Sequence, residues 1–236
     1  MKLPRLALAL ALIAAALLLA AGPGTRLALW DFRAGFQLFA WAAFTGLAAA
    51  ASAFVMLLIG QLRRAHGAML GVALMLGLGV AFVPWNGMRQ AKKVPPIHDI
   101  STDTTHPPGF VAILPLRAGA ANSATYGGAE VAQQQAKAYP DIRPYVTSDA
   151  PSLVYDHALK VAHSMGWQIV ASDPASGRIE ATATTAWFGF KDDVVIRIEP
   201  ALGGSRVDMR SVSRVGQSDV GTNASRIRAF MQRLAQ

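Results

Sequence analysis

The sequence contains no cysteine, and this absence excludes several kinds of chemistry at once. Thiol catalysis, disulfide bonds and zinc sites built on cysteine all require a residue that the chain does not have. The absence fits a periplasmic protein, because stray thiols would oxidise there. Cytosolic proteins can lack cysteine as well, so this observation alone does not assign a compartment.

Charged side chains are scarce in the first 85 residues, which hold six basic residues and one acidic residue. The rest of the chain holds the other sixteen basic and thirteen acidic residues, so the formal charge of +8 divides into +5 and +3. No run of lysine and arginine comparable to a nucleic-acid-binding arm occurs. The composition predicts a membrane domain over residues 1–85, a soluble domain over residues 86–236, and no nucleic-acid partner.

Three stretches without a charged side chain are long enough to span a bilayer, at about residues 6–21, 36–59 and 68–84. The first follows Lys2 and Arg5 and could also be a signal peptide. Its end is a poor cleavage site and two more apolar stretches follow, so the sequence favours an uncleaved span. Because no ionisable side chain lies inside the three stretches, an ion or proton pathway through them is not expected.

Two signals give opposite orientations for these spans. With the N-terminus inside, four basic residues lie inside and five lie outside, which slightly disfavours that choice. A basic start followed by an apolar stretch, however, normally inserts with its basic end in the cytoplasm. We therefore predict a multi-pass protein of the bacterial inner membrane whose C-terminal domain lies in the periplasm.

Prolines are concentrated in the segment that follows the third apolar stretch. Nine of the thirteen lie between Pro84 and Pro151, where they favour extended or turning backbone over long helices. Apolar residues such as Ile97, Phe110 and Ile142 would serve no purpose in a solvated linker. Residues 86–151 are therefore predicted to form a leader that wraps over the soluble domain.

Beyond this leader, the hydrophobic pattern becomes regular. It predicts a helix, four strands and a closing helix, at about residues 153–165, 167–171, 178–187, 194–199, 206–215 and 219–234. Sequential strands joined by short turns indicate an antiparallel meander, which the two helices would cover on its apolar face. The expected fold class is α+β: three N-terminal transmembrane helices, then a two-layer domain of about four strands and two helices.

Charged residues alternate along three of these strands and are expected on the outward face of the sheet. They are Arg178, Glu180, Arg197, Glu199, Arg206, Asp208 and Arg210. Opposite charges on neighbouring strands would form a ladder of exposed salt bridges, each worth less than about 1 kcal/mol. The alternative interpretation is a polar platform for an anionic head group or a partner protein.

The turn that leads into the last predicted helix combines features suited to hold a phosphate or carboxylate. Ser218 is a suitable N-cap, and a helix N-terminus offers unpaired N–H groups and a partial positive charge. Asp219 could instead satisfy the helix start and neutralise an arginine, which would leave a structural network. The hypothetical anion site consists of Arg210, Arg214, Ser218, Asn223 and Arg226.

Nothing in the sequence indicates an active site. The histidines lack a zinc-binding spacing, and no fingerprint of a serine hydrolase, zinc protease, P-loop or dinucleotide-binding protein occurs. No metal or cofactor is expected, and a non-enzymatic role is favoured. The alternative is an envelope hydrolase that uses Asp192 and Asp193, or Asp219.

Several long sequence words in the second half carry a resemblance to a known family. They include PPIHDISTDT at residues 95–104, YPDI at 139–142, GRIEATATTAWFGFKDDVVIRI at 177–198 and GSRVDMRSVSRVGQSDVGTNASRIRAF at 204–230. From about residue 95 onward the chain resembles the domain of unknown function 1499 (DUF1499). The resemblance implies a bacterial membrane or envelope-associated protein and supplies no catalytic residues.

Together these observations predict an integral membrane protein, in contact with membrane lipid, that displays a soluble domain. The domain would bind an anionic or lipidic envelope component, or an envelope protein. A membrane scaffold with a purely structural docking domain is the other alternative.

Overall fold

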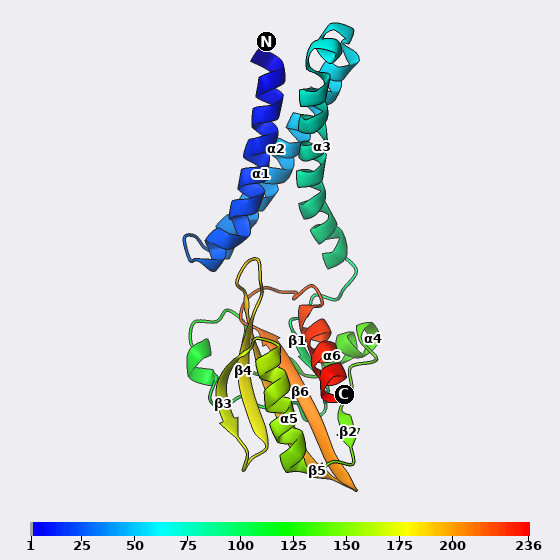
Figure 1. The fold of residues 1–236 in the computed structure, drawn as a ribbon. Coiled ribbons are helices and arrows are strands. Elements are labelled where there is room, and N and C mark those ends of the chain that lie inside the picture. The colour runs from blue at the N-terminus through cyan, green and yellow to red at the C-terminus, as the bar shows by residue number, and fades with distance from the viewer. Residues whose placement is uncertain (1) are drawn as a thin grey trace. The chain divides into compact units, whose positions relative to one another are not determined.

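The computed structural model describes residues 2–236, which form two compact units. One unit holds the chain up to Lys92 together with Ala186–Gly189. The other holds Lys93–Thr185 and Phe190–Gln236. The elements of both units are labelled in Figure 1.

The first unit contains three helices, each long and apolar enough to cross a membrane: α1 (Lys2–Arg26), α2 (Phe32–Leu58) and α3 (Gly60–Ala91). The first and third predicted spans lie inside α1 and α3, and the second, residues 36–59, ends one residue beyond α2. The carboxylate of Asp31 caps α2 by accepting a hydrogen bond of 2.8 Å from the amide of Ala34. The backbone at His66 is not helical, so α3 is kinked between its polar first turns and its apolar stretch.

Helices α2 and α3 pack through two glycines. A Cβ atom on Gly46 would lie 2.7 Å from the carbonyl oxygen of Gly77, and one on Gly77 would collide with the carbonyl oxygen of Gly46. By contrast, a Cβ atom on Gly71 or Gly79 would meet nothing within 4 Å. Of these α3 glycines, Gly77 therefore lies in the helix contact and the other two face open space.

The second unit is built on one antiparallel sheet with strand order β1-β6-β5-β4-β3, in which β2 also pairs with β6. The strands are β1 (Asp99–Ser101), β2 (Tyr145–Thr147), β3 (Gln168–Asp173), β4 (Arg178–Thr184), β5 (Lys191–Ala201) and β6 (Gly204–Ser213). Strands β3 to β6 form the predicted meander. The sheet has six strands rather than four, because the proline-rich leader adds β1 and β2. Each has only three residues, too few to show an alternating pattern.

Helices α5 (Pro151–Ser164) and α6 (Thr222–Leu234) cover one face of this sheet (Figure 1). The core between the sheet and these helices consists of apolar side chains from β4, β5, β6 and both helices, together with Trp167 and leader residues such as Ile100 and Ile142. Within it, the rings of Trp167 and Phe230 stack with centroids 5.5 Å apart. This arrangement confirms the predicted two-layer core.

The leader seals one edge of the sheet. Helix α4 (Gly128–Ala138) buries Gln135 beside β1, where its side-chain amide accepts a hydrogen bond of 2.9 Å from the Ser101 amide. The same side chain donates one of 2.7 Å to the Ser101 carbonyl. The Gln135 side chain therefore pairs with the backbone amide and carbonyl of Ser101 as a neighbouring strand would do, and these two groups are not left free at the sheet edge.

Residues 102–126 of the leader, here called the strap, cross the opposite face of the sheet. The strap contains a short 3₁₀ helix, η1 (Leu114–Arg117), and packs Phe110 and Ile113 against Val195 and Val212. The face expected to be an outward polar surface is therefore largely covered by the strap. Sequence periodicity marks this face as polar but cannot show that distant residues cover it.

Candidate functional site

A buried glutamate on β4 fixes the middle of the strap. The carboxylate of Glu180 accepts hydrogen bonds from three consecutive amides, those of Val111 (2.9 Å), Ala112 (3.2 Å) and Ile113 (2.9 Å). Arg178 Nε lies 3.1 Å from the same carboxylate. Hydrogen bonds to an ionised acceptor are roughly twice as strong as neutral ones, so Glu180 is a main anchor of the strap.

We expect Glu180→Gln to lower the free energy of unfolding by about 1–3 kcal/mol. The amide keeps one acceptor oxygen and turns a donor toward backbone N–H groups, so at least one buried amide loses its partner. Denaturant unfolding measures the cost, and limited proteolysis should show new cleavage near residues 110–117. Glu199→Gln, at an exposed position beside Arg197, is the matched control. An equal loss of stability and an equal pattern of proteolysis in the two variants would contradict this role of Glu180.

A second anchor is formed around Asp193 on β5, which is fully buried. Its carboxylate lies 2.6 Å from Arg117 Nη1 of the strap and 2.8 Å from both Nε and Nη2 of Arg214. The Thr182 hydroxyl donates a further hydrogen bond of 2.8 Å. Burial by itself raises the pKa of Asp193, but the hydrogen bonds from Arg214, Thr182 and Arg117 outweigh it and hold the pKa below its ordinary value.

This lowered pKa predicts loss of stability in acid. A carboxylate whose folded pKa is lowered contributes stability above its unfolded pKa of about 3.9 and loses it as the pH falls through the folded pKa. We therefore expect the free energy of unfolding to fall below about pH 4. Denaturant titrations of the wild type and Asp193→Asn check this, since the variant should be less stable at neutral pH and less sensitive to acid. An unchanged acid slope in Asp193→Asn would contradict the assignment.

Arg210 on β6 forms the third anchor. Its guanidinium is buried and pairs with Asp99 through two contacts, Nε to Oδ1 at 2.9 Å and Nη2 to Oδ2 at 2.7 Å. It also donates to the carbonyl oxygens of Pro108 (3.3 Å) and Ala124 (2.8 Å) in the strap.

The strap also places two aromatic rings against this guanidinium. The ring centroids of Phe110 and Tyr126 lie 5.3 and 5.4 Å from it. Burial, together with the negative charge of Asp99, raises the pKa of Tyr126 to about 12. The planar cation is thus held both by hydrogen bonds and by aromatic faces, an arrangement that lysine could not reproduce.

The start of α6 carries a connected polar network. Arg226 lies 2.6 Å from Asp192 and donates to the Ser211 hydroxyl at 2.9 Å, and it also hydrogen-bonds Asn223. The Asn223 amide donates to the His98 carbonyl and to the Ser213 hydroxyl, both at 3.0 Å. This network joins α6 to β5, β6 and the leader.

The carboxylate of Asp219 occupies the N-terminus of α6. It accepts hydrogen bonds from the amides of Gly221 (2.8 Å) and Asn223 (2.7 Å). Burial and the nearby charge of Asp192 raise its pKa despite these hydrogen bonds. Ser218, the expected cap, instead donates to the Pro95 carbonyl at 3.3 Å. A carboxyl group of the chain itself thus occupies the helix start at which an external anion was expected to bind.

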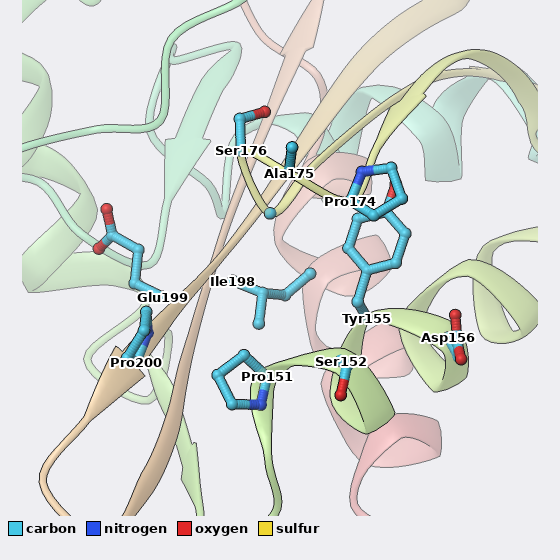
Figure 2. Close-up of a pocket in the computed structure, with 11 residues that line it drawn as sticks. Pro151, Ser152, Tyr155, Asp156, Pro174, Ala175, Ser176, Ile198, Glu199 and Pro200 are labelled. Carbon is cyan, nitrogen blue, oxygen red and sulfur yellow. The ribbon is translucent and has the colours of Figure 1, made fainter.

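Another part of the second unit forms a hollow of about 320 Å³ between the first turns of α5, the β3–β4 turn and the end of β5. Figure 2 shows Ile198 in its middle, with Pro151, Pro174 and Pro200 around it. Tyr155 is held in place because its hydroxyl lies 2.7 Å from the Ser172 hydroxyl. Gly177 has φ +62° and lies so close to the Ile198 carbonyl that a Cβ atom would collide with it.

A second hollow of about 230 Å³ lies on the other side of the first turns of α5. It is lined by Tyr145, Thr147, Asp149, Leu153, Val154, His157 and Leu234. We call the residues that line the two hollows, together with the exposed Leu202 of the β5–β6 turn, the α5 surface.

The profile of a family described as "Protein of unknown function (DUF1499)" matches residues 99–234, more than half of the chain. The chain belongs to this family. The matched segment runs from β1 to the end of α6, so the DUF1499 domain includes the strap, the sheet and both covering helices. No curated protein matches the chain. Family membership therefore confirms the resemblance seen in the sequence and assigns no activity.

The five residues of the hypothetical anion site are divided among different contacts of the DUF1499 domain. Arg226 and Asn223 share one network, Arg214 joins Asp193, and Arg210 joins Asp99. Ser218 bonds the leader backbone. Groups of the protein engage all five side chains, and binding of an external anion by them stays a prediction.

The three carboxylates proposed for a hydrolase are also engaged by the DUF1499 domain. Asp192 pairs with Arg226, Asp193 with two arginines, and Asp219 with backbone amides. Within residues 2–236, no group of three or more histidine and acidic side chains is placed to hold a metal ion.

Sequence reasoning did not identify the α5 surface of the DUF1499 domain. One signal was present: Leu153 lies beside Val154, which belongs to the buried stripe of the helix, and is therefore directed away from the core. The side chain of Leu153 is 64% exposed in the structure. A large apolar residue off the buried stripe, next to Pro151 and Asp156, is a pattern that could indicate a contact surface.

Proposed function

We propose that this protein is a multi-pass membrane protein that displays its DUF1499 domain as a docking module for a partner protein. Three helices that are long and apolar enough to cross a membrane support the membrane part. The bacterial inner membrane and a periplasmic domain belong to the proposal, and the signal-like start of α1 supports them.

The α5 surface is the single observation that carries the docking role. It combines two adjoining hollows with two exposed leucines, Leu153 and Leu202. Exposed apolar side chains beside preformed concave surface are typical of protein contacts, where their burial supplies the driving force. The charged residues on the strap-covered face, in contrast, already have internal partners.

Two other functions of the DUF1499 domain have less support. A hydrolase would require a carboxylate free to act as acid or base, and Asp192, Asp193 and Asp219 are all committed to internal contacts. An anionic lipid bound at Arg210 would have to displace Asp99 and leave that carboxylate unpaired in a buried place. Docking of a partner protein requires neither a free carboxylate nor the displacement of Asp99.

Site-specific photo-cross-linking of the full chain in living cells tests the docking role. A photoreactive residue at position 153 or 202 should give the same discrete protein adduct, and Leu202→Asp should abolish the adduct formed from position 153. Position 160, an exposed lysine further along α5, is the control and should give no such adduct. Absence of adducts from positions 153 and 202, or an identical adduct from position 160, would overturn the proposal.

The proposed orientation, with the DUF1499 domain in the periplasm, can be tested separately with reporter fusions. A reporter that is active only in the periplasm, fused after Gln236, should be active, because the basic start of α1 stays in the cytoplasm and three spans follow. A fluorescent reporter that matures only in the cytoplasm, fused at the same position, is the matched control. Activity of the cytoplasmic reporter alone would reverse the orientation.

A further inference from the structure

We infer that the partner segment that binds the α5 surface is basic and amphipathic, with arginine or lysine side chains beside apolar ones. This inference rests on the proposed docking function and adds the chemistry of the occupant. It follows from the charges that line the two hollows, from the apolar groups beside those charges, and from the rigidity of the walls.

The lining of the two hollows contains acidic side chains and no lysine or arginine among the described residues. Asp156 and Glu199 line the first hollow and Asp149 lines the second. Asp156 forms no ion pair within residues 2–236, whereas the Glu199 carboxylate lies 3.4 Å from Arg197 on the strap-covered face of the sheet. This acidic lining contrasts with the formal charge of +3 that residues 86–236 carry.

The apolar part of the first hollow lies beside the carboxylate of Asp156, whereas Glu199, the strand neighbour of Ile198, directs its carboxylate to the strap-covered face. Figure 2 places Glu199 and Asp156 on opposite sides of Ile198, with proline rings around the middle. Arginine and lysine have an aliphatic stem that packs on apolar surface and a charged head that stays at the rim. The hollow offers both environments at once; the exposed Leu153 lines the second hollow, and the exposed Leu202 follows Pro200 of the first hollow by two residues.

The walls of this hollow are rigid before anything binds. Pro151, Pro174 and Pro200 have fixed φ angles, and Tyr155 is buried and held by Ser172. A preformed wall avoids part of the entropy cost of ordering side chains on binding. The volume of about 320 Å³ is at the lower end of the range of small-molecule sites, about 300–1,000 Å³, and suits one or two side chains of a segment.

The same charges argue against an anionic membrane surface as the occupant. Anionic head groups attract basic segments and repel carboxylates, and the residues that line the two hollows include Asp149 and Asp156 but no lysine or arginine. The N-terminus of α5 supplies an opposing charge of only about half a unit. Its first residue, Pro151, has no N–H group to offer an anion.

A binding experiment on the full chain in nanodiscs of uncharged lipid tests the chemistry of the occupant. The probe is a fluorescent synthetic peptide of alternating arginine and leucine, and empty nanodiscs give the baseline. We expect saturable binding that Asp156→Lys weakens about tenfold, because reversing one rim charge changes the electrostatic attraction of the probe. Glu130→Lys reverses another exposed carboxylate, on α4, and should leave the affinity within about twofold of the wild type.

Three results would overturn the inference: no saturable binding above empty nanodiscs, equal weakening by Asp156→Lys and Glu130→Lys, or co-flotation of the nanodiscs with phosphatidylglycerol vesicles in place of peptide binding. The cross-linking described above separates the two proposals. An adduct at position 153 that Asp156→Lys leaves unchanged would retain docking and contradict the basic occupant. Absence of the adduct contradicts docking itself.

Discussion

Replacing Arg210 by alanine is expected to lower the free energy of unfolding of the DUF1499 domain by about 3–5 kcal/mol. The variant leaves Asp99, which is only 4% exposed, as a buried carboxylate without its cation. It also removes the hydrogen bonds to two strap carbonyls and the contact with the rings of Phe110 and Tyr126. Denaturant unfolding of the full chain measures the loss.

Two further variants show whether the loss of stability in Arg210→Ala comes from the buried ion pair or would follow from removing any arginine of the domain. Arg228→Ala removes an arginine from an exposed pair with Asp141 and should cost about 0.2–1 kcal/mol. Adding Asp99→Asn to Arg210→Ala removes the unpaired charge and should recover part of the stability. A cost for Arg210→Ala no larger than that for Arg228→Ala would show that the strap is not held as described.

Replacing Gly77 by leucine is expected to destabilise the packing of α2 against α3 by at least about 1–3 kcal/mol. The new side chain would start from a Cβ position occupied by the Gly46 carbonyl and would also press on the backbone nitrogen of Ala50, 3.0 Å away. Because these neighbours are backbone atoms, they cannot move aside as a flexible side chain would. Unfolding in mixed micelles, followed by tryptophan fluorescence, measures the change.

Gly71→Leu is the matched control on the same helix. A Cβ atom at Gly71 meets nothing within 4 Å, and leucine has a helix propensity about 1 kcal/mol better than glycine. This variant should therefore be as stable as the wild type or slightly more stable. Equal destabilisation by the two substitutions would contradict the α2–α3 contact through Gly46 and Gly77.

Local sequence patterns predicted the longer helices and strands of the DUF1499 domain well. The period of two in strands β4, β5 and β6 and the stripe of apolar residues on α5 and α6 led directly to the meander and its covering helices. Strands β1 and β2 were missed because three residues cannot show alternation. Their place beside β6 depends on pairing with residues at least 58 positions away, such as Tyr145 with Val207.

The partners of the charged residues could not be predicted for a related reason. Glu180 accepts from amides 67 to 69 residues earlier in the chain, and Arg210 pairs with a carboxylate 111 residues earlier. A sequence shows that these residues are polar and face away from the main core. It does not show that a distant segment returns over them, so the arginines were interpreted as an anion site.

The roles of the glycines in helices α2 and α3 were equally difficult to predict from the sequence. Gly71, Gly77 and Gly79 lie close together in one apolar stretch, and only the packed structure distinguishes the contact at Gly77 from the open positions. Small residues permit close helix approach but do not select the neighbour. Contacts that depend on tertiary arrangement therefore remained outside what residue patterns could indicate.

Amide hydrogen exchange of the full chain in nanodiscs tests most directly whether the polar face of the sheet serves to bind the strap. We predict that the amides of Val111, Ala112 and Ile113, held by Glu180, exchange as slowly as those of β5 and β6. In Glu180→Gln this protection should fall while that of β5 persists. Fast exchange of the three amides in the wild type would contradict this role of the strap, because the polar face would then be open to a ligand.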